Sequence, residues 1–220
     1  MSQLLPRGLY AITPDERYTP RLLALVSAAV AGGAVLVQYR NKTASPELRR
    51  EQITALLPVC HAAGADLIVN DDVELAIELD ADGVHLGCDD APESLAAVRQ
   101  LLGPNRILGV SCYNDFSLAQ NAAVIGADYL ALGSLFDSPT KPAAVKATLE
   151  LVAEVRRRFG LPVVAIGGIT IANAPSVIAA GADLLAVITD LFNAADIKLQ
   201  AQNYAALYSA TATSHAGANF

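Results

Sequence analysis

The segment Ala63-Gly64-Ala65-Asp66-Leu67-Ile68-Val69-Asn70-Asp71-Asp72 joins a helix end, a short buried strand and a polar step. Gly64 can supply the left-handed residue with which helices commonly end, and the continuous apolar run after it is typical of a buried parallel strand. Similar joins recur at 31–34, 79–83, 126–128 and 180–183. Repeated helix-to-strand joins indicate parallel βαβ units.

This repeat predicts eight strands alternating with eight helices. The strands are expected at 8–12, 35–39, 66–70, 83–86, 107–111, 129–132, 162–166 and 184–188. The helices are expected at 20–31, 46–62, 73–79, 92–102, 115–125, 147–159, 173–180 and 196–208. A doubly wound sheet is one solution, but the even repeat favours an α/β fold with a single (β/α)8 TIM barrel. We expect one catalytic domain over 1–210 and a disordered tail over 211–220, which is small and polar.

The composition of the chain argues against several classes of partner and location. A net charge of −7, a pI near 4.9 and the absence of Trp argue against nucleic-acid partners. No apolar run approaches the roughly 18–20 residues of a membrane span. The three cysteines form no C-x-x-C pair and the first residues show no secretory pattern, so we expect a cytoplasmic protein. The negative charge would repel anionic substrates, so a phosphate site must be built locally from a few cations and backbone amides.

Polar residues follow several of the predicted strands, at the end where barrel enzymes have their active sites. Arg40 and Lys42 follow the second strand and can face one anion, although an ordinary solvated loop is the alternative. Asp72 directly precedes a helix and is expected to cap it. Asp71 is freer to bind a hard cation, which would indicate a phosphorylated substrate.

Three further features are ambiguous from the residues alone. The run from Asp90 to Glu93 reads as a capping box, which favours a cap over a metal ligand at Asp90. Lys141 ends a long loop over 133–141 and could reach a leaving diphosphate, but exposed loop lysines are common. Gly167-Gly168 and Thr189 follow the last two strands, where barrels often bind a phosphate.

His85 lies inside an apolar run and is expected to be a buried histidine with satisfied hydrogen bonds, not a base or a ligand. No Ser–His–Asp or Cys–His–Asp grouping is readable along the chain. Acyl-enzyme chemistry is therefore not expected.

From Gly8 to about Phe192 the chain resembles the thiamine phosphate synthase (thiamine-phosphate pyrophosphorylase) family. The resemblance lies in six motifs in family order: the run Gly8 to Thr13, Gln38-Tyr39-Arg40-Asn41-Lys42, the run Leu67 to Asp72, the run Ala81 to Gly87, the run Leu108 to Ser111, and the run Ile166 to Ile169.

The resemblance implies a Mg²⁺-dependent transferase of thiamine biosynthesis. Such enzymes join 4-amino-2-methyl-5-hydroxymethylpyrimidine diphosphate to 4-methyl-5-(2-phosphoethyl)thiazole, giving thiamine phosphate and diphosphate by a dissociative substitution. It implies a pyrimidine diphosphate site of Gln38, Tyr39, Arg40, Asn41, Lys42, Asn70, Ser111 and Lys141, with Arg40, Lys42 and Lys141 as the catalytic cations. It implies a thiazole phosphate site of Ser138, Pro139, Thr140, Gly168, Ile188 and Thr189, and a metal site of Asp71 and Asp90.

Two departures concern the loops. Cys88 stands where the family usually has Gln, and Ser138-Pro139-Thr140-Lys141 stands where Thr-x-Thr-Lys is common.

One rival function is the same-fold thiazole tautomerase, which relies on a histidine where this chain has Tyr113. The others are a non-catalytic barrel that binds thiamine precursors and a Schiff-base lyase using Lys42 or Lys141. The expected partners are small phosphorylated substrates, and a homo-oligomer stays open.

Overall fold

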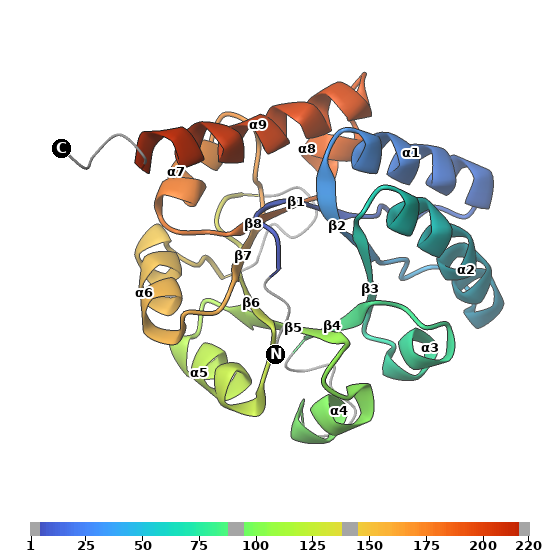
Figure 1. The fold of residues 1–220 in the computed structure, drawn as a ribbon, viewed down its shortest axis with the longest axis horizontal. Coiled ribbons are helices and arrows are strands. Elements are labelled where there is room, and N and C mark those ends of the chain that lie inside the picture. Colours follow the sequence, from blue (N-terminus) through green and yellow to red (C-terminus); the bar gives the residue numbers. More distant parts are fainter. Residues whose placement is uncertain (1–4, 88–94, 138–144, 216–220) are drawn as a thin grey trace.

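The computed structural model describes residues 5–87, 95–137 and 145–215. Eight parallel strands form a closed barrel in sequence order, with helices around the outside (Figure 1). The strands are β1 (Gly8–Ile12), β2 (Ala34–Tyr39), β3 (Asp66–Asn70), β4 (Gly83–Gly87), β5 (Ile107–Tyr113), β6 (Tyr129–Leu132), β7 (Val163–Ile166) and β8 (Leu184–Val187). The predicted (β/α)8 barrel is confirmed.

The helices agree with the prediction except at the C-terminal end. They are α1 (Thr19–Ala31), α2 (Pro46–Ala62), α3 (Val73–Glu78), α4 (Leu95–Leu102), α5 (Phe116–Ile125), α6 (Leu149–Phe159), α7 (Ala174–Ala179), α8 (Thr189–Phe192) and α9 (Ile197–His215). The single turn α8 was not predicted, because four residues are too few to show helical periodicity. Helix α9 continues through 211–215, which belong to the segment predicted to be a disordered tail. Extending a helix that already exists needs no new nucleus. Residues 216–220 lie outside the described chain.

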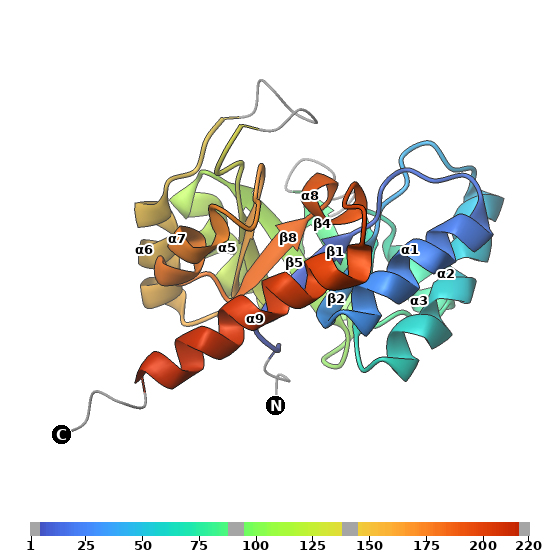
Figure 2. The same cartoon turned by 90° about the horizontal axis from the view of Figure 1, so that it is seen from above.

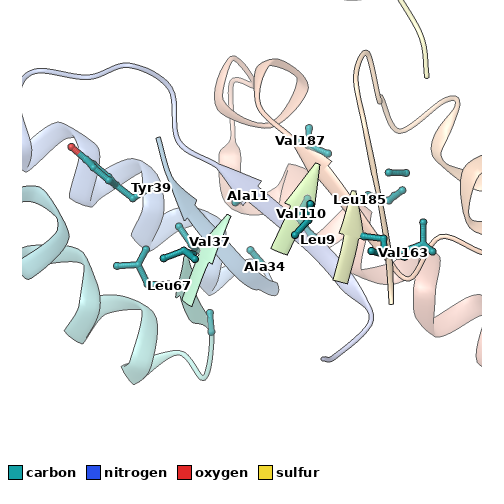
Figure 3. Close-up of a cluster of buried hydrophobic side chains, with 14 of the residues drawn as sticks. Leu9, Ala11, Ala34, Val37, Tyr39, Leu67, Val110, Val163, Leu185 and Val187 are labelled. Atoms are coloured by element: carbon teal, nitrogen blue, oxygen red, sulfur yellow. The ribbon is translucent and has the colours of Figure 1, made fainter. Parts of the chain in front are cut away.

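Alternation along the strands divides the hydrophobic core into two layers. Tyr10, Leu36, Ile68 and Tyr129 belong to the layer that fills the barrel interior. Residues one position along the same strands pack between the barrel and the helices, as Leu9, Val37 and Leu67 show in Figure 3. Because side chains of a strand point to opposite faces in turn, one short strand supplies both layers. Residues that continue the interior rows therefore reach the carboxyl end of the barrel.

A glycine makes room for two rings inside the barrel. The strand register places Gly109 beside His85 on β4 and beside Tyr129 on β6. A Cβ atom on Gly109 would lie 1.9 Å from Cζ of Tyr129. The Tyr129 ring thus occupies the space that any other residue at 109 would need.

Candidate active site

The predicted site residues that the structure describes lie at or just after the carboxyl ends of the strands. All eight strands are parallel, so their carboxyl ends face the same way. Figure 2 shows the loops after β1 and β2 and the short helix α8 at this end, with the N-terminus at the other. The strand ends therefore bring Arg40, Asn70, Ser111 and Gly168 to one face, as predicted.

The segment after β2, residues 40–43, is named here the cation loop. Its backbone is fixed by the loop after β1. Thr13 Oγ1 accepts from Arg40 N at 2.9 Å and donates to Arg40 O at 3.1 Å, and Asp15 Oδ1 accepts from Lys42 N at 2.8 Å. Within the described ranges, neither Arg40 nor Lys42 forms an ion pair. The fold thus fixes the backbone of both residues, while their charged side-chain groups have no ion-pair partner among the described residues.

Two side chains predicted to bind substrate also take part in the hydrogen bonds around the cation loop. Asn41 Nδ2 donates to Glu16 O at 2.7 Å and to Gln52 Oε1 at 3.1 Å. Tyr39 Oη also donates to Gln52 Oε1, at 2.8 Å, and its side chain lies in the outer layer under α2. Burial raises the pKa of the Tyr39 phenol, which keeps the group a hydrogen-bond donor.

Gln52 was missed by the sequence reading. It is fully buried in α2, and its Nε2 donates to Glu16 O at 2.8 Å. One signal was available, because Gln52 stands on the buried face of its helix beside Ile53 and Leu56. A polar residue on a buried face is expected to have specific partners.

Lys42, Asn70 and Asp71 line one hollow at the ends of β2 and β3. It measures about 270 Å³ and is also lined by Tyr39, Asn41, Arg49, Val69 and Asp72. Asp71 has φ of 62°, in the left-handed region that aspartate tolerates, and its N–H donates to His85 O at 2.9 Å. Asn70 Nδ2 donates to Asp71 Oδ2 at 2.5 Å. The hollow thus combines two cations, two side-chain amides and two carboxylates, and Arg40 is not part of its lining.

Asp72 caps α3, as predicted. Its Oδ1 accepts from Leu75 N at 3.1 Å, and its Oδ2 lies 3.3 Å from Arg49 Nη1. The carboxylate therefore has a structural role that accounts for its place after Asp71.

Replacing Asp72 with alanine is expected to lower the free energy of unfolding by about 1 kcal/mol, because the first turn of α3 loses its cap. The partly exposed pair with Arg49 adds little. Urea unfolding of the variant beside Asp72→Asn measures this, since asparagine caps about as well as aspartate. A similar loss for both variants would show that the cap is not the cause.

At the end of β7, two glycines accept close packing from the segment after β6. Gly167 and Gly168 have φ of 100° and 63°. A Cβ atom at Gly168 would lie 2.4 Å from Asp137 O, and one at Gly167 would lie 2.1 Å from Ser134 Oγ. Phe136 N donates to Gly167 O at 3.0 Å. The glycine pair is thus needed for this packing, whether or not a phosphate binds there. Ile188 and Thr189 follow on the neighbouring strand, as the N-cap and first residue of α8.

His85 is a buried histidine with two partners, as predicted. Its Nδ1 lies 2.9 Å from Tyr129 Oη and its Nε2 lies 2.9 Å from Ser111 Oγ. The ring stacks on Tyr129 with centroids 5.6 Å apart. Burial lowers the pKa of His85 from 6.5 to about 4, because the charged form would lose its hydration.

This pKa predicts an acid-sensitive stability. The unfolded chain takes up a proton near pH 6.5 and folded His85 only near 4, so stability is complete above 6.5 and falls between those values. The loss from this group should reach roughly 2 kcal/mol by pH 5. Denaturant unfolding at pH 7, 6 and 5 measures it, with His85→Gln as the variant that cannot titrate. Parallel pH curves for both proteins would contradict the assignment.

Five predicted site residues lie outside the described ranges: Asp90, Ser138, Pro139, Thr140 and Lys141.

Among the residues that the structure does describe, no group of three or more His, Cys, Asp and Glu side chains could hold a metal ion. Asp71 offers one carboxylate of the kind that Mg²⁺ prefers, and the amide of Asn70 is adjacent. This part of the site fits a hard cation but needs a further ligand.

A second hollow, of about 400 Å³, lies near the opposite end of the barrel. It is lined by polar groups that contact one another, such as His61 with Asp82 at 2.9 Å and Arg106 with Asp80 at 2.6 Å. None of the predicted site residues lines it. Mutual pairing of these groups accounts for their presence there.

Comparison with known proteins identifies the fold's family. Residues 9–191 match the family model described as thiamine monophosphate synthase. The chain belongs to this family. It is 52% identical to a thiamine-phosphate synthase of Methylobacillus flagellatus, over 92% of this chain and 95% of the relative. It is 50% identical to one of Aromatoleum aromaticum, over 93% of this chain and 97% of that protein.

A solved member of the family has the same architecture. The thiamine phosphate pyrophosphorylase from Pyrococcus furiosus superposes with a TM-score of 0.82 at 32% identity, covering 92% of this chain and 96% of its own. The barrel described above is therefore the fold of the thiamine monophosphate synthase family. No helix in the described ranges is long and apolar enough to cross a membrane.

Proposed function

We propose that the chain is a thiamine-phosphate synthase. This transferase joins 4-amino-2-methyl-5-hydroxymethylpyrimidine diphosphate to 4-methyl-5-(2-phosphoethyl)thiazole and releases thiamine phosphate and diphosphate. The observation that carries the proposal is identity of about 50% to curated thiamine-phosphate synthases over more than nine-tenths of the chain. The cations and carboxylate at one end of the barrel fit a diphosphate substrate.

The reaction requires stabilisation of the negative charge on the leaving diphosphate and needs no general base. The bond between the pyrimidine methylene carbon and the diphosphate oxygen breaks, and the diphosphate leaves with the electron pair. The lone pair of the thiazole nitrogen then forms the new C–N bond, and no proton has to move. Arg40, Lys42 and Lys141 would bind the diphosphate as its negative charge develops. A buried neutral His85 is consistent with a reaction that uses no general base.

In this proposal Asp71 and Asp90 hold Mg²⁺, which supplies further neutralisation of the leaving diphosphate. The carboxylate of Asp71 in the hollow beside Lys42 supports the assignment. Gln38, Asn70 and Ser111 would contact the pyrimidine diphosphate. Asn41 would act by holding the cation loop, and Tyr39 by holding Gln52, which Asn41 also contacts.

The thiazole phosphate would lie between the loop after β6 and the ends of β7 and β8. Ser138, Pro139 and Thr140 would approach it from the loop. Gly168, Ile188 and Thr189 would approach it from strand ends where barrels often bind phosphate. We place the enzyme in the cytoplasm and propose no macromolecular partner beyond a second copy of the chain.

The test mixes both substrates with Mg²⁺ and measures thiamine phosphate and released diphosphate. We expect both products in equal amounts, and loss of both when a chelator removes the metal. Binding of both substrates without product, under conditions where a known synthase works, would indicate a non-catalytic barrel. Isomerisation of a thiazole carboxylate would indicate the tautomerase, and borohydride trapping of a substrate would indicate the lyase.

A further inference from the structure

The hollow at the ends of β2 and β3 contains a second cation besides Lys42, and this cation is not Arg40. Arg49 of α2 lines the hollow together with Lys42, Asp71 and Asp72, whereas Arg40 does not. Arg49 lies in none of the motifs that resemble the family, and the proposed function gives it no role. Its place beside the proposed diphosphate site therefore needs an explanation.

The fold brings the start of α2 to the carboxyl end of the barrel, because this helix follows β2. Arg49 N donates to Ser45 O at 2.9 Å, so Arg49 belongs to the first turns of the helix. Its Nη1 donates to Asp72 Oδ2 at 3.3 Å. Since Asp72 also lines the hollow, the charged end of the Arg49 side chain lies beside the hollow, and not its aliphatic stem alone.

The guanidinium of Arg49 has poor partners in this position. The hydrogen bond of 3.3 Å to Asp72 is longer than the about 2.7–2.9 Å that is usual between charged groups. The two side chains are 37% and 30% exposed, and an ion pair as exposed as this contributes little. Arg49 Nε is shielded from solvent and has no hydrogen-bond partner among the described residues. The guanidinium can therefore leave Asp72 for a stronger anion at small cost.

The charges around the hollow favour a phosphate group as that anion. The formal charges of Lys42 and Arg49 balance those of Asp71 and Asp72, so a cation bound at Asp71 would make the hollow positive. A guanidinium can donate two parallel hydrogen bonds to two oxygens of one phosphate, whereas the ammonium of a lysine acts as a point charge. Arg49 can thus orient a phosphate group that Lys42 can only attract.

We propose that Arg49 is a further binding residue for the diphosphate, which it contacts with two N–H groups after leaving Asp72. The inference rests on the proposed function, from which it takes the diphosphate as ligand. The cap of α3 does not depend on Arg49, because it uses the other carboxylate oxygen: Asp72 Oδ1 accepts from Leu75 N at 3.1 Å. Release of Arg49 from Asp72 therefore leaves the start of α3 intact.

The first test measures binding of inorganic diphosphate by titration calorimetry, with Mg²⁺ present and both organic substrates absent. Arg49→Gln keeps a polar side chain but removes the charge and the fork, and it should raise the dissociation constant about tenfold. Arg49→Lys keeps the charge and loses only the fork, so its dissociation constant should rise about threefold. An unchanged affinity in folded Arg49→Gln would overturn the proposal. Should that variant not fold, an unchanged affinity in Arg49→Lys would do the same.

The matched control is Arg50→Gln, the same change one residue along the same helix. Arg50 Nη2 donates to Glu78 Oε2 at 2.8 Å, so it also pairs with α3, but it does not line the hollow. We expect its affinity for diphosphate to stay within about twofold of wild type, because exposed charges are screened by salt. Equal weakening in Arg49→Gln and Arg50→Gln would overturn the proposal, since the affinity would then follow the total charge of the helix.

A second pair of variants separates contact with the diphosphate from support of Asp72. Asp72→Asn removes the carboxylate that Arg49 contacts, while asparagine can still cap α3. In this background Arg49→Gln should still weaken diphosphate binding about tenfold. If Arg49 served only to hold Asp72, its replacement would have no effect once that carboxylate is gone. Loss of the effect in the Asp72→Asn background would therefore overturn the proposal.

Diphosphate binding and product formation are separate outcomes. A wild type whose diphosphate affinity depends on Arg49, but which makes no thiamine phosphate, would refute only the proposed function. A wild type that makes thiamine phosphate, but whose diphosphate affinity is the same without Arg49, would refute only the role of Arg49. A wild type that does not bind diphosphate would also overturn that role.

Discussion

Replacing Asp71 with asparagine is expected to lower the turnover number about 100-fold while the free energy of unfolding changes little. The side chain keeps its size, and asparagine tolerates the left-handed φ of 62° at this position. What is lost is one negative charge in the hollow that also contains Lys42. A carboxamide is a weaker ligand for a hard cation than a carboxylate is, so the Mg²⁺ concentration for half-maximal activity should rise as well.

The matched control is Asp72→Asn, one residue along the chain. It removes the same charge from the lining of the same hollow, but asparagine can still cap α3. We expect its turnover to stay within about twofold of wild type. Equal losses in both variants would mean that the hollow responds to total charge and that Asp71 has no special place in it. Steady-state rates over a range of Mg²⁺ concentrations separate the two cases.

Replacing Gly109 with alanine is expected to destabilise the barrel by about 3 kcal/mol or to prevent folding, which is among the larger costs of overpacking a core. The new Cβ atom would lie 1.9 Å from Cζ and 2.2 Å from Oη of Tyr129. Tyr129 is fully buried, so its ring has nowhere to move. Thermal and denaturant unfolding of purified protein measure the loss.

Two variants show whether the clash is the cause. Gly64→Ala also adds one methyl group, but nothing lies within 4 Å of its Cβ position, and its left-handed φ of 73° should cost only about 1 kcal/mol. In Gly109→Ala combined with Tyr129→Ala, the space of the missing ring should accept the new methyl group. The double variant should therefore be less destabilised than the sum of the single changes. Simple additivity would exclude a steric origin.

The strands could be predicted well from the sequence because characteristic residues stand before and after them. A glycine join precedes β3 and a polar step follows it, and its predicted and observed bounds agree at 66–70. Helix α8 has no such residues at its ends. Helix α9 extends through small residues whose composition had suggested disorder. Local chemistry also predicted the cap at Asp72, since a cap depends on residues three positions apart.

Contacts between distant strands could not be predicted in the same way. His85 was expected to be buried and satisfied, but its partners Ser111 and Tyr129 are 26 and 44 positions away. Their meeting depends on the register of β4, β5 and β6. Motif matching likewise could not show that the side chains of Tyr39 and Asn41 share Gln52 as a hydrogen-bond partner. The assignments at Asp90, Lys141 and 138–140 stay predictions.

The contacts around the cation loop have a consequence for protein engineering. Its residues Arg40 and Lys42 are held through Thr13 and Asp15, which come from a different loop, and Asn41 is held through Gln52 on a helix. The motif from Gln38 to Lys42 therefore does not adopt its conformation independently of the rest of the barrel. Transplanting it into another barrel would require the turn after β1 and a glutamine on the following helix to move with it. The smallest unit that can be grafted is a set of three segments.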